Sequence, residues 1–89
     1  MNIIDIDMFT ETFTKYGYAK EYINNCLAYS KNDSYYKITY VKDMDGYVLE
    51  SADSKKDALK NLYEDSEFIK NNDKEKVLLE LEKILKNIG

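Results

Sequence analysis

Two short runs in the middle of the chain constrain the fold most, because together they predict a β-hairpin. Residues 35–42 (YYKITYVK) alternate in polarity and are rich in β-branched and aromatic side chains, which is typical of a strand. Residues 47–51 (YVLES) are expected to form the partner strand, and the segment Asp43-Met44-Asp45-Gly46 predicts the turn between them. An isolated hairpin is only marginally stable in water, so this one must pack against other elements.

The register of this hairpin depends on the length of its loop. A loop of four residues places Leu49 opposite Tyr40 and Val48 opposite Val41, whereas a two-residue loop at the Asp-Gly pair would place Leu49 opposite Lys42. The four-residue loop keeps like side chains together on each face, and we therefore expect it.

Helical patterns precede the hairpin. Residues 5–16 predict a short helix capped by Asp5 or Asp7, and Gly17 is expected to end or kink it. Residues 18–30 predict a second helical segment, because apolar residues recur there at helical spacing. The first face consists of Met8, Phe9, Thr12 and Phe13, and the second of Ala19, Tyr22, Ile23, Cys26 and Leu27. The pattern leaves open whether residues 5–30 form one bent helix or two.

Helical patterns also follow the hairpin. Ser54 to Asp57 has the spacing of a capping box and predicts a helix to about Glu64, which residues 66–70 either continue or extend by a turn. Asn72 is expected to cap a final amphipathic helix. Its apolar face would consist of Val77, Leu78, Leu81, Ile84, Leu85 and Ile88. We therefore expect a single α+β domain over residues 1–89, in the order α-α-β-β-α-α.

Missing residue types restrict the chemistry that the chain can perform. It contains no His, Arg, Trp or Pro, and all 13 basic residues are Lys. Without His the commonest general base near neutral pH is absent, and without Arg so is the bidentate fork that clamps phosphates and guanine edges. The lone Cys26 excludes an internal disulfide, and we expect it to be a small core residue rather than a nucleophile. We expect no enzyme activity and no cofactor.

A metal site is also not expected. Asp43-x-Asp45-Gly46 has the spacing of half a calcium loop, but positions 1 and 12 of that loop would be Val41 and Ala52, which cannot bind calcium. A hairpin turn is the better interpretation. No apolar run approaches the length needed to span a bilayer, and residues 1–9 lack the basic region of a signal peptide. We therefore expect a cytoplasmic protein.

Acidic residues gather in the second half of the predicted hairpin and the segment after it. Residues 43–67 carry eight carboxylates against three lysines, a net charge of −5, whereas the whole chain carries −4. Such a patch attracts a basic partner and speeds encounter, although it can also be a solvated face that keeps the protein in solution. The candidate residues are Asp43, Asp45, Glu50, Asp53, Asp57, Glu64 and Asp65.

Tyrosines form the second candidate surface. The chain has nine, and Tyr35, Tyr36, Tyr40 and Tyr47 fall on the hairpin. Because only one face of a small hairpin can be buried on helices, some of these rings are expected to be exposed, and Tyr35, Tyr36 and Tyr47 are the candidate partner contacts. Direct nucleic-acid binding needs a positive groove that an acidic chain without Arg does not supply. Mimicry of nucleic acid by carboxylates is the better hypothesis.

The stretch KITYVKDMDGYVLESADSKKDALKNLYED (residues 37–65) resembles in organisation small phage anti-CRISPR proteins, which inhibit a Cas nuclease by occupying its DNA-binding surface. Those proteins are also acidic and are built as helix, short sheet and helices. The resemblance implies that the carboxylates named above, together with Tyr47, face a basic groove. The segment is also similar to small antitoxin-like domains, although it lacks their further strand and glycine turn.

We therefore expect a non-enzymatic inhibitor or regulator that binds a basic protein surface, such as that of a nuclease, and binds neither nucleic acid nor membrane. One alternative is an antitoxin, immunity or adaptor module that binds its partner through exposed Tyr. Another is a homodimer that assembles through a free strand edge.

Overall fold

The computed structural model describes residues 7–88, with side chains described from Phe9 onward. Along the chain the elements are α1 (Asp7–Lys15), β1 (Ala19–Ile23), β2 (Cys26–Lys31), β3 (Ser34–Val41), the 3-10 turn η1 (Lys42–Met44), β4 (Gly46–Ala52), α2 (Lys55–Leu59), β5 (Glu64–Lys70) and α3 (Lys74–Ile88). The α+β class holds, but the expected order α-α-β-β-α-α is wrong, because five strands replace the single hairpin.

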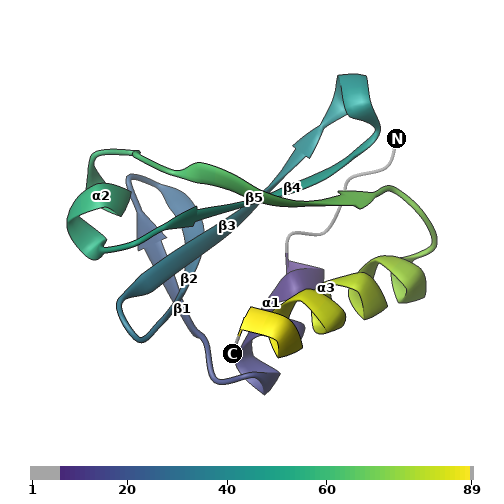
Figure 1. Ribbon diagram of the computed structural model, residues 1–89, viewed down its shortest axis with the longest axis horizontal. Helices are drawn as coiled ribbons and strands as arrows, with labels where there is room; N and C mark the ends of the chain where they lie inside the picture. The colour runs from purple at the N-terminus through teal and green to yellow at the C-terminus, as the bar shows by residue number, and fades with distance from the viewer. Residues whose placement is uncertain (1–6, 89) are drawn as a thin grey trace.

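The five strands form one antiparallel sheet in the order β1-β2-β3-β4-β5, so each strand pairs with its neighbour in sequence. Helices α1 and α3 lie side by side on one face, and the short α2 lies at one end of the sheet against the other face (Figure 1). The main core lies between α1, α3 and the sheet, and includes Phe13, Tyr29, Leu49, Ile69 and Leu81. A smaller core under α2 joins Ile23, Ala28, Tyr35, Ala52 and Ala58.

The second helix expected over residues 18–30 is instead the hairpin β1–β2. Asn24 and Asn25 form its two-residue turn, with positive φ values of 53° and 64°. Both central residues of a type I′ turn need positive φ, and Asn tolerates it better than most residues. Asn32 and Asp33 repeat this geometry between β2 and β3, with φ values of 52° and 68°. Two such turns make a meander of three strands in place of a helix.

The first helix ends as expected. Gly17 has φ of +89°, the Tyr18 N–H donates to the Phe13 carbonyl, and the Gly17 N–H donates to the Thr14 carbonyl. This pair of bonds is a Schellman motif, which usually carries an apolar contact between the residues at its ends. Here the Phe13 and Tyr18 rings meet edge to face at 5.2 Å. The expected capping residue Asp5, and the side chains of Asp7 and Met8, lie outside the described part.

The hairpin β3–β4 is confirmed, but its expected register is wrong by one position on each strand. Tyr40 pairs with Tyr47 and Ile38 with Leu49, so the four-residue loop covers residues 42–45 rather than 43–46. Asp45, not Gly46, takes the left-handed conformation, with φ of 45°. The shift preserves which side chains share a face, because it moves the partner of each residue by two positions, from Leu49 to Tyr47 in the case of Tyr40.

The segment after the hairpin differs most from expectation. The Ser54 Oγ accepts the Asp57 N–H at 3.1 Å, which confirms the cap, but α2 ends at Leu59. Residues 64–70 are not helical, because they pair with β4 as strand β5. The final helix is confirmed, although Asp73 rather than Asn72 provides the capping carbonyl, which accepts the Val77 N–H. Its residues Val77, Leu81 and Leu85 are buried.

Candidate functional site

Four of the seven predicted acidic residues lie together at one end of the sheet. Asp53, Asp57 and Glu64 line a shallow depression of about 350 Å³ between the end of β4, α2 and the start of β5. Asp65 follows Glu64 along β5 and pairs with Glu50. We call these four residues, Asp53, Asp57, Glu64 and Asp65, the carboxylate corner.

The negative charge of the carboxylate corner is exposed to solvent and is not offset by an ion pair among the described residues. Asp53, Glu64 and Asp65 are exposed and Asp57 is half-buried. Among the described residues none of the four forms an ion pair, and the nearby Lys55 binds Glu21 instead, at 3.4 Å. The backbone of Asp57 is held at both ends, because its N–H donates to Ser54 and its carbonyl accepts the Leu62 N–H. The corner is thus a fixed concentration of negative charge facing solvent.

The other three acidic candidates add no free charge to the corner. The Glu50 carboxylate forms an ion pair with the Lys37 ammonium at 3.4 Å, which offsets its charge. Asp43 and Asp45 lie at the opposite end of β4, six residues and therefore roughly 20 Å from the corner. The acidic run of the sequence is thus divided in space, and the seven candidate carboxylates do not form one continuous surface.

Asp45 has a local structural role. Its carboxylate accepts the Tyr40 hydroxyl at 2.8 Å and the Asn71 amide N–H at 3.1 Å. These bonds stabilise the charged form and hold the pKa of the Asp45 carboxyl below its ordinary value, while the same bond raises the pKa of the Tyr40 hydroxyl. Asp45 therefore ties the β3–β4 loop to the segment between β5 and α3.

The candidate aromatic contacts are buried. Tyr36 and Tyr47 belong to the main core and Tyr35 to the smaller one, so none presents a ring to solvent. The expectation of exposed hairpin tyrosines is met only by Tyr40, at 40% exposure. The error follows from the number of strands: a single hairpin has a free face, whereas a five-stranded sheet with helices on both faces covers nearly all of these rings.

Two apolar residues missed in the sequence lie beside the carboxylate corner. Leu59 ends α2 and is 52% exposed, and Leu62 lines the acidic depression and is 57% exposed. A helix continuing to about Glu64, as the sequence predicts, would turn both side chains towards the core. Since α2 ends after five residues, the chain turns at Asn61, where φ is 59°, and both side chains face solvent.

Lys37 secures the loop that carries Leu62. Its ammonium lies 4.3 Å from the centre of the Tyr63 ring and donates to the Asn61 side-chain oxygen at 3.2 Å. A cation over an aromatic face is attracted by the ring, most strongly when partly desolvated. Burial is the main cause that raises the pKa of the Tyr63 hydroxyl. The corner is therefore supported from beneath by a lysine, an aromatic ring and Glu50.

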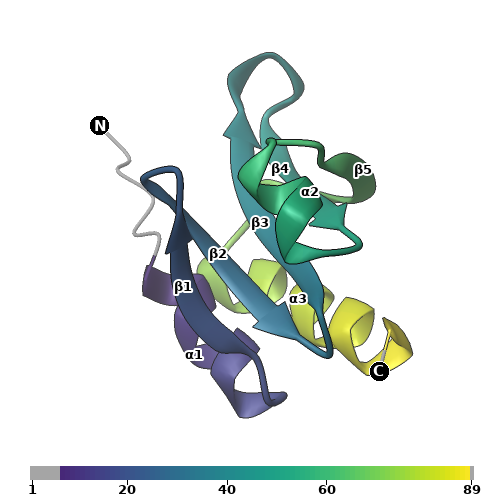
Figure 2. The same ribbon diagram turned by 90° about the vertical axis from the view of Figure 1, so that its left-hand side faces the viewer.

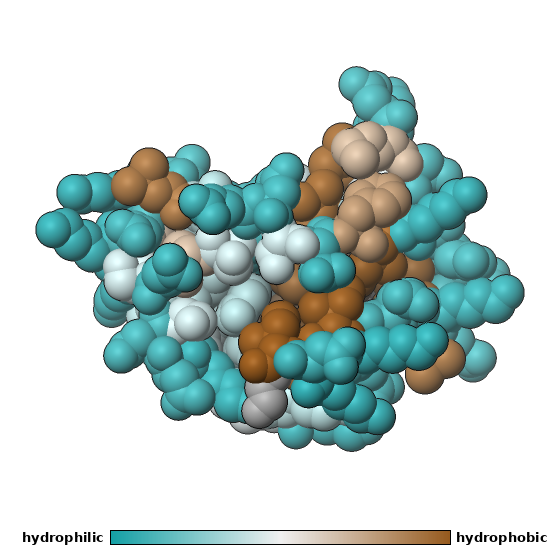
Figure 3. All heavy atoms as spheres, in the orientation of Figure 1, coloured by the Kyte–Doolittle hydropathy of each residue, from teal (hydrophilic) through white to brown (hydrophobic). Residues whose placement is uncertain are grey.

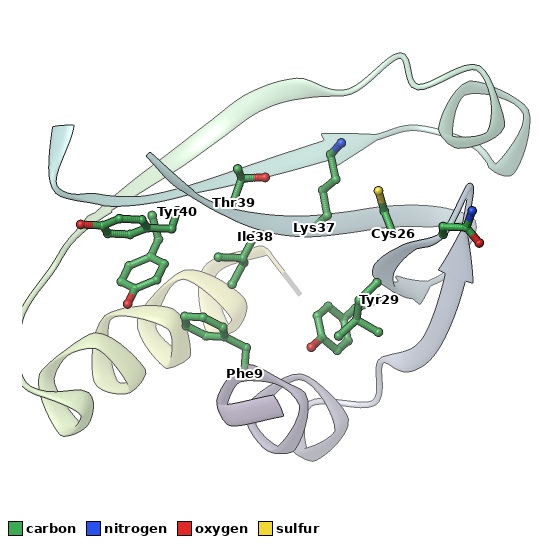
Figure 4. A pocket seen from close by; sticks show the side chains of 10 residues that line it. Phe9, Cys26, Tyr29, Lys37, Ile38, Thr39 and Tyr40 are labelled. Carbon is green, nitrogen blue, oxygen red and sulfur yellow. The ribbon is translucent and has the colours of Figure 1, made fainter. Parts of the chain in front are cut away.

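A groove opens where β2 and β3 separate. The two strands pair only from Tyr29 opposite Tyr36 to the turn, and beyond that point the β1–β2 and β3–β4 hairpins diverge (Figure 2). The groove has a volume of about 510 Å³. Tyr29 and Ile38 point from the strands towards the helices and Phe9 points from α1 towards the strands, whereas Lys37 and Cys26 point to the opposite face (Figure 4). The lining on its helix side is aromatic and aliphatic, so that side offers packing.

The remaining expectations concern a thiol, metal ligands and membrane spans. Cys26 is exposed at the start of β2, so its assignment to the core is wrong: the turn at Asn24 and Asn25 places it at the tip of a hairpin. Within residues 7–88 no cluster of three or more Cys, Asp or Glu side chains is arranged to hold a metal ion. No helix in the same range is both long and apolar enough to cross a membrane.

Comparisons with protein-family models, with curated proteins and with solved structures find no match to this chain.

Proposed function

We propose that the protein is a non-enzymatic binding module that docks a basic surface of a partner protein on the carboxylate corner. The observation that carries this proposal is the gathering of Asp53, Asp57 and Glu64 around one depression, with Asp65 next to Glu64 along β5. None of the four forms an ion pair among the described residues. Like charges held close together repel one another, so an opposite charge brought by a partner relieves that repulsion.

The exposed leucines support a protein partner over a free cation or a polyamine. Leu62 lines the acidic depression and Leu59 ends α2, the helix that carries Asp57, and both are exposed. Protein interfaces combine an apolar centre with a charged rim. A few side chains near the centre of an interface usually supply most of the binding energy, while the charges accelerate encounter and select the partner.

The partner class follows from the sign and spacing of the charge. A surface that binds nucleic acid carries lysine and arginine spaced to meet phosphates, and carboxylates on a rigid support can occupy the same positions. We therefore propose a nucleic-acid-binding protein, such as a nuclease, as the partner, and inhibition by occupation of its nucleic-acid site as the outcome. An inhibitor of the anti-CRISPR type, suggested by the resemblance of residues 37–65, would act in this way.

The test compares reversal of charge at the corner with the same change elsewhere. The tagged protein, its Asp53→Lys/Glu64→Lys variant and a control Asp43→Lys/Glu80→Lys variant are used to capture proteins from the native host lysate at low salt. All four positions are exposed, and both variants change the net charge by the same amount. We expect the control to retain a nucleic-acid-binding protein that the corner variant loses.

The captured protein is then purified and its affinity measured against salt. We expect the affinity to fall steeply with ionic strength, because the contact is electrostatic, and we expect the module to displace DNA or RNA from the partner. Equal capture by both variants, or a captured protein that binds nucleic acid and the module simultaneously, would show that the corner does not perform this function. The alternative of a Tyr-anchored module is not favoured, because Tyr35, Tyr36 and Tyr47 are buried.

A further inference from the structure

Strand β5 is an open edge of the sheet. It pairs with β4 on one side, and no described strand lies on its other side. The Asn71 N–H donates to the Asp45 carbonyl across the β4 side, so by the alternation of an antiparallel ladder Ile69 also points towards β4. Phe68 and Lys70 then direct their backbone N–H and C=O groups outward. This edge is able to accept another strand.

The charges along this edge change sign halfway. The first half of β5 carries Glu64, Asp65 and Glu67. The second half ends at Lys70, beside a groove of about 460 Å³ between β5 and α3 that also contains Lys76 and Lys83. Lys83 has only a weak exposed contact within its own helix, to Glu80 at 3.7 Å. An acidic half thus continues directly into a basic half.

Apolar side chains lie where the two halves meet. Phe68 is 43% exposed on β5, and Leu79 of α3 is 56% exposed in the adjoining groove. A band of hydrophobic atoms crosses this side of the molecule from the β3–β4 hairpin towards the space between β5 and α3, with hydrophilic atoms on both sides (Figure 3). An apolar centre with acidic and basic flanks complements itself when rotated by a half turn.

We infer that β5 pairs with β5 of a second copy of the chain, antiparallel and centred on Phe68. This register pairs Phe68 with Phe68 of the second copy on the axis, and Ser66 with the second copy's Lys70. The acidic half of each strand then faces the basic half of the other, together with the lysines of α3. The register uses the outward-pointing groups of Phe68 and Lys70, so the two sheets join into one of ten strands.

The β5 pairing goes beyond the proposed function and can fail separately from it. Asp53 and Asp57 take no part in the pairing, while Lys76 and Lys83 take no part in the carboxylate corner. The β4–β5 register shifts between Leu49, which pairs with Glu67, and Glu50, which pairs with Asp65, so Ser66 is an extra residue on β5. Because a bulge twists the edge away, backbone pairing with the second copy is confined to residues 66–70, and Glu64 and Asp65 lie just beyond the paired segment. The contact is therefore short, and we expect a weak dimer controlled by charge.

Sedimentation velocity of the full chain from micromolar to millimolar concentration tests the pairing. We expect a monomer–dimer equilibrium that weakens as salt is raised. Two charge-reversed variants follow. Lys76→Glu/Lys83→Glu makes the edge mainly acidic, with Lys70 remaining, and Glu64→Lys/Glu67→Lys makes it mainly basic, with Asp65 remaining. Each should dimerise at least about tenfold more weakly than the wild type, because the two-fold axis changes four exposed charge contacts at once. Lys56→Glu/Lys60→Glu, altered away from β5, should dimerise as the wild type does.

Mixing the two reversed variants gives the decisive result. An acidic edge and a basic edge attract each other, so the mixture should form a heterodimer that neither variant forms alone, and circular dichroism should show both variants folded. Three results would each overturn the pairing. The wild type could stay monomeric to millimolar concentration, both reversed variants could dimerise as strongly as the wild type, or the mixture could stay monomeric. If the wild type stays monomeric, the charges on β5 prevent the open edge from pairing with another chain.

Discussion

Replacement of Gly46 by alanine is expected to destabilise the protein, although the same change in a strand usually has the opposite effect. Gly46 begins β4 in an ordinary extended conformation, paired with Lys70 of β5. An added Cβ would lie 2.8 Å from the Ile69 carbonyl oxygen and would overlap the edge of the Phe68 ring. Ordinary contacts to Cβ begin at 3.4 Å, so both neighbours must move.

The two clashes differ in how easily they are relieved. Phe68 is half-exposed and its ring can turn outward, whereas the Ile69 carbonyl belongs to the β4–β5 ladder and moves only if that ladder distorts. Overpacking of this kind costs about 1 to 3 kcal/mol, while removing glycine's freedom in the unfolded chain returns about 0.4 to 1 kcal/mol. We expect a net loss of about 1 to 2 kcal/mol.

Thermal and urea unfolding of wild type and Gly46→Ala measure this loss. For a domain of this size the melting temperature should fall by about 4 to 16 °C. A Phe68→Ala variant provides the matched background, because it removes the ring clash and keeps the carbonyl clash. Gly46→Ala should destabilise this variant too, but by less than it destabilises the wild type. A Gly46→Ala protein as stable as wild type would refute the close approach of β5 to β4 at this position.

Two further predictions concern the C-terminal end of α1 and its contacts. Gly17→Ala should destabilise the protein by about 1 kcal/mol, because a side chain is strained at a φ of +89°. No clash adds to this strain, since the nearest atom to an added Cβ is the Lys31 Cε at 3.6 Å, an ordinary contact. Urea unfolding measures the loss, and an unchanged midpoint would contradict the prediction. The Glu82 carboxylate accepts the Tyr16 hydroxyl at 2.9 Å and the Lys15 ammonium at 3.3 Å, which lower the pKa of its carboxyl from the ordinary 4.5. A lowered pKa in the folded state stabilises the protein above pH 4.5, and this contribution is lost as the pH falls through the folded value. Glu82→Gln should therefore unfold more readily at pH 7 and lose less stability on acidification; parallel loss in both proteins would contradict the assignment.

Features that depend on neighbouring residues in sequence were predictable. The cap at Ser54, the helix end at Gly17 and the amphipathic α3 all arise from contacts within a few positions, and the structure contains each of them. The hairpin β3–β4 followed from alternation and a turn of suitable composition. Its register could not be predicted, because Asp45 adopts the left-handed conformation, whereas the neighbouring Gly46 does not.

Features that depend on distant pairing were not predictable from local pattern. Residues 64–70 contain four charged residues, and Ile69 is the one buried residue of the segment. The polarity therefore does not alternate, and the pattern does not reveal a strand. Residues 18–30 place apolar side chains at spacings that fit one helix face, yet the same residues fit two short strands once the Asn-Asn pair is taken as a turn. The paired asparagines at 24 and 25 were the available signal.

These errors change the candidate site as well as the fold. With a single hairpin, the acidic run would lie on one continuous surface and the tyrosines on its free face. With five strands, β4 separates Asp43 and Asp45 from the carboxylate corner by its full length, and Lys37 offsets Glu50. The sheet covers the tyrosines and exposes Leu59, Leu62 and Phe68 in their place. What remains is two smaller surfaces, an acidic corner with leucines and a strand edge with both charge signs, and each is suited to a different partner.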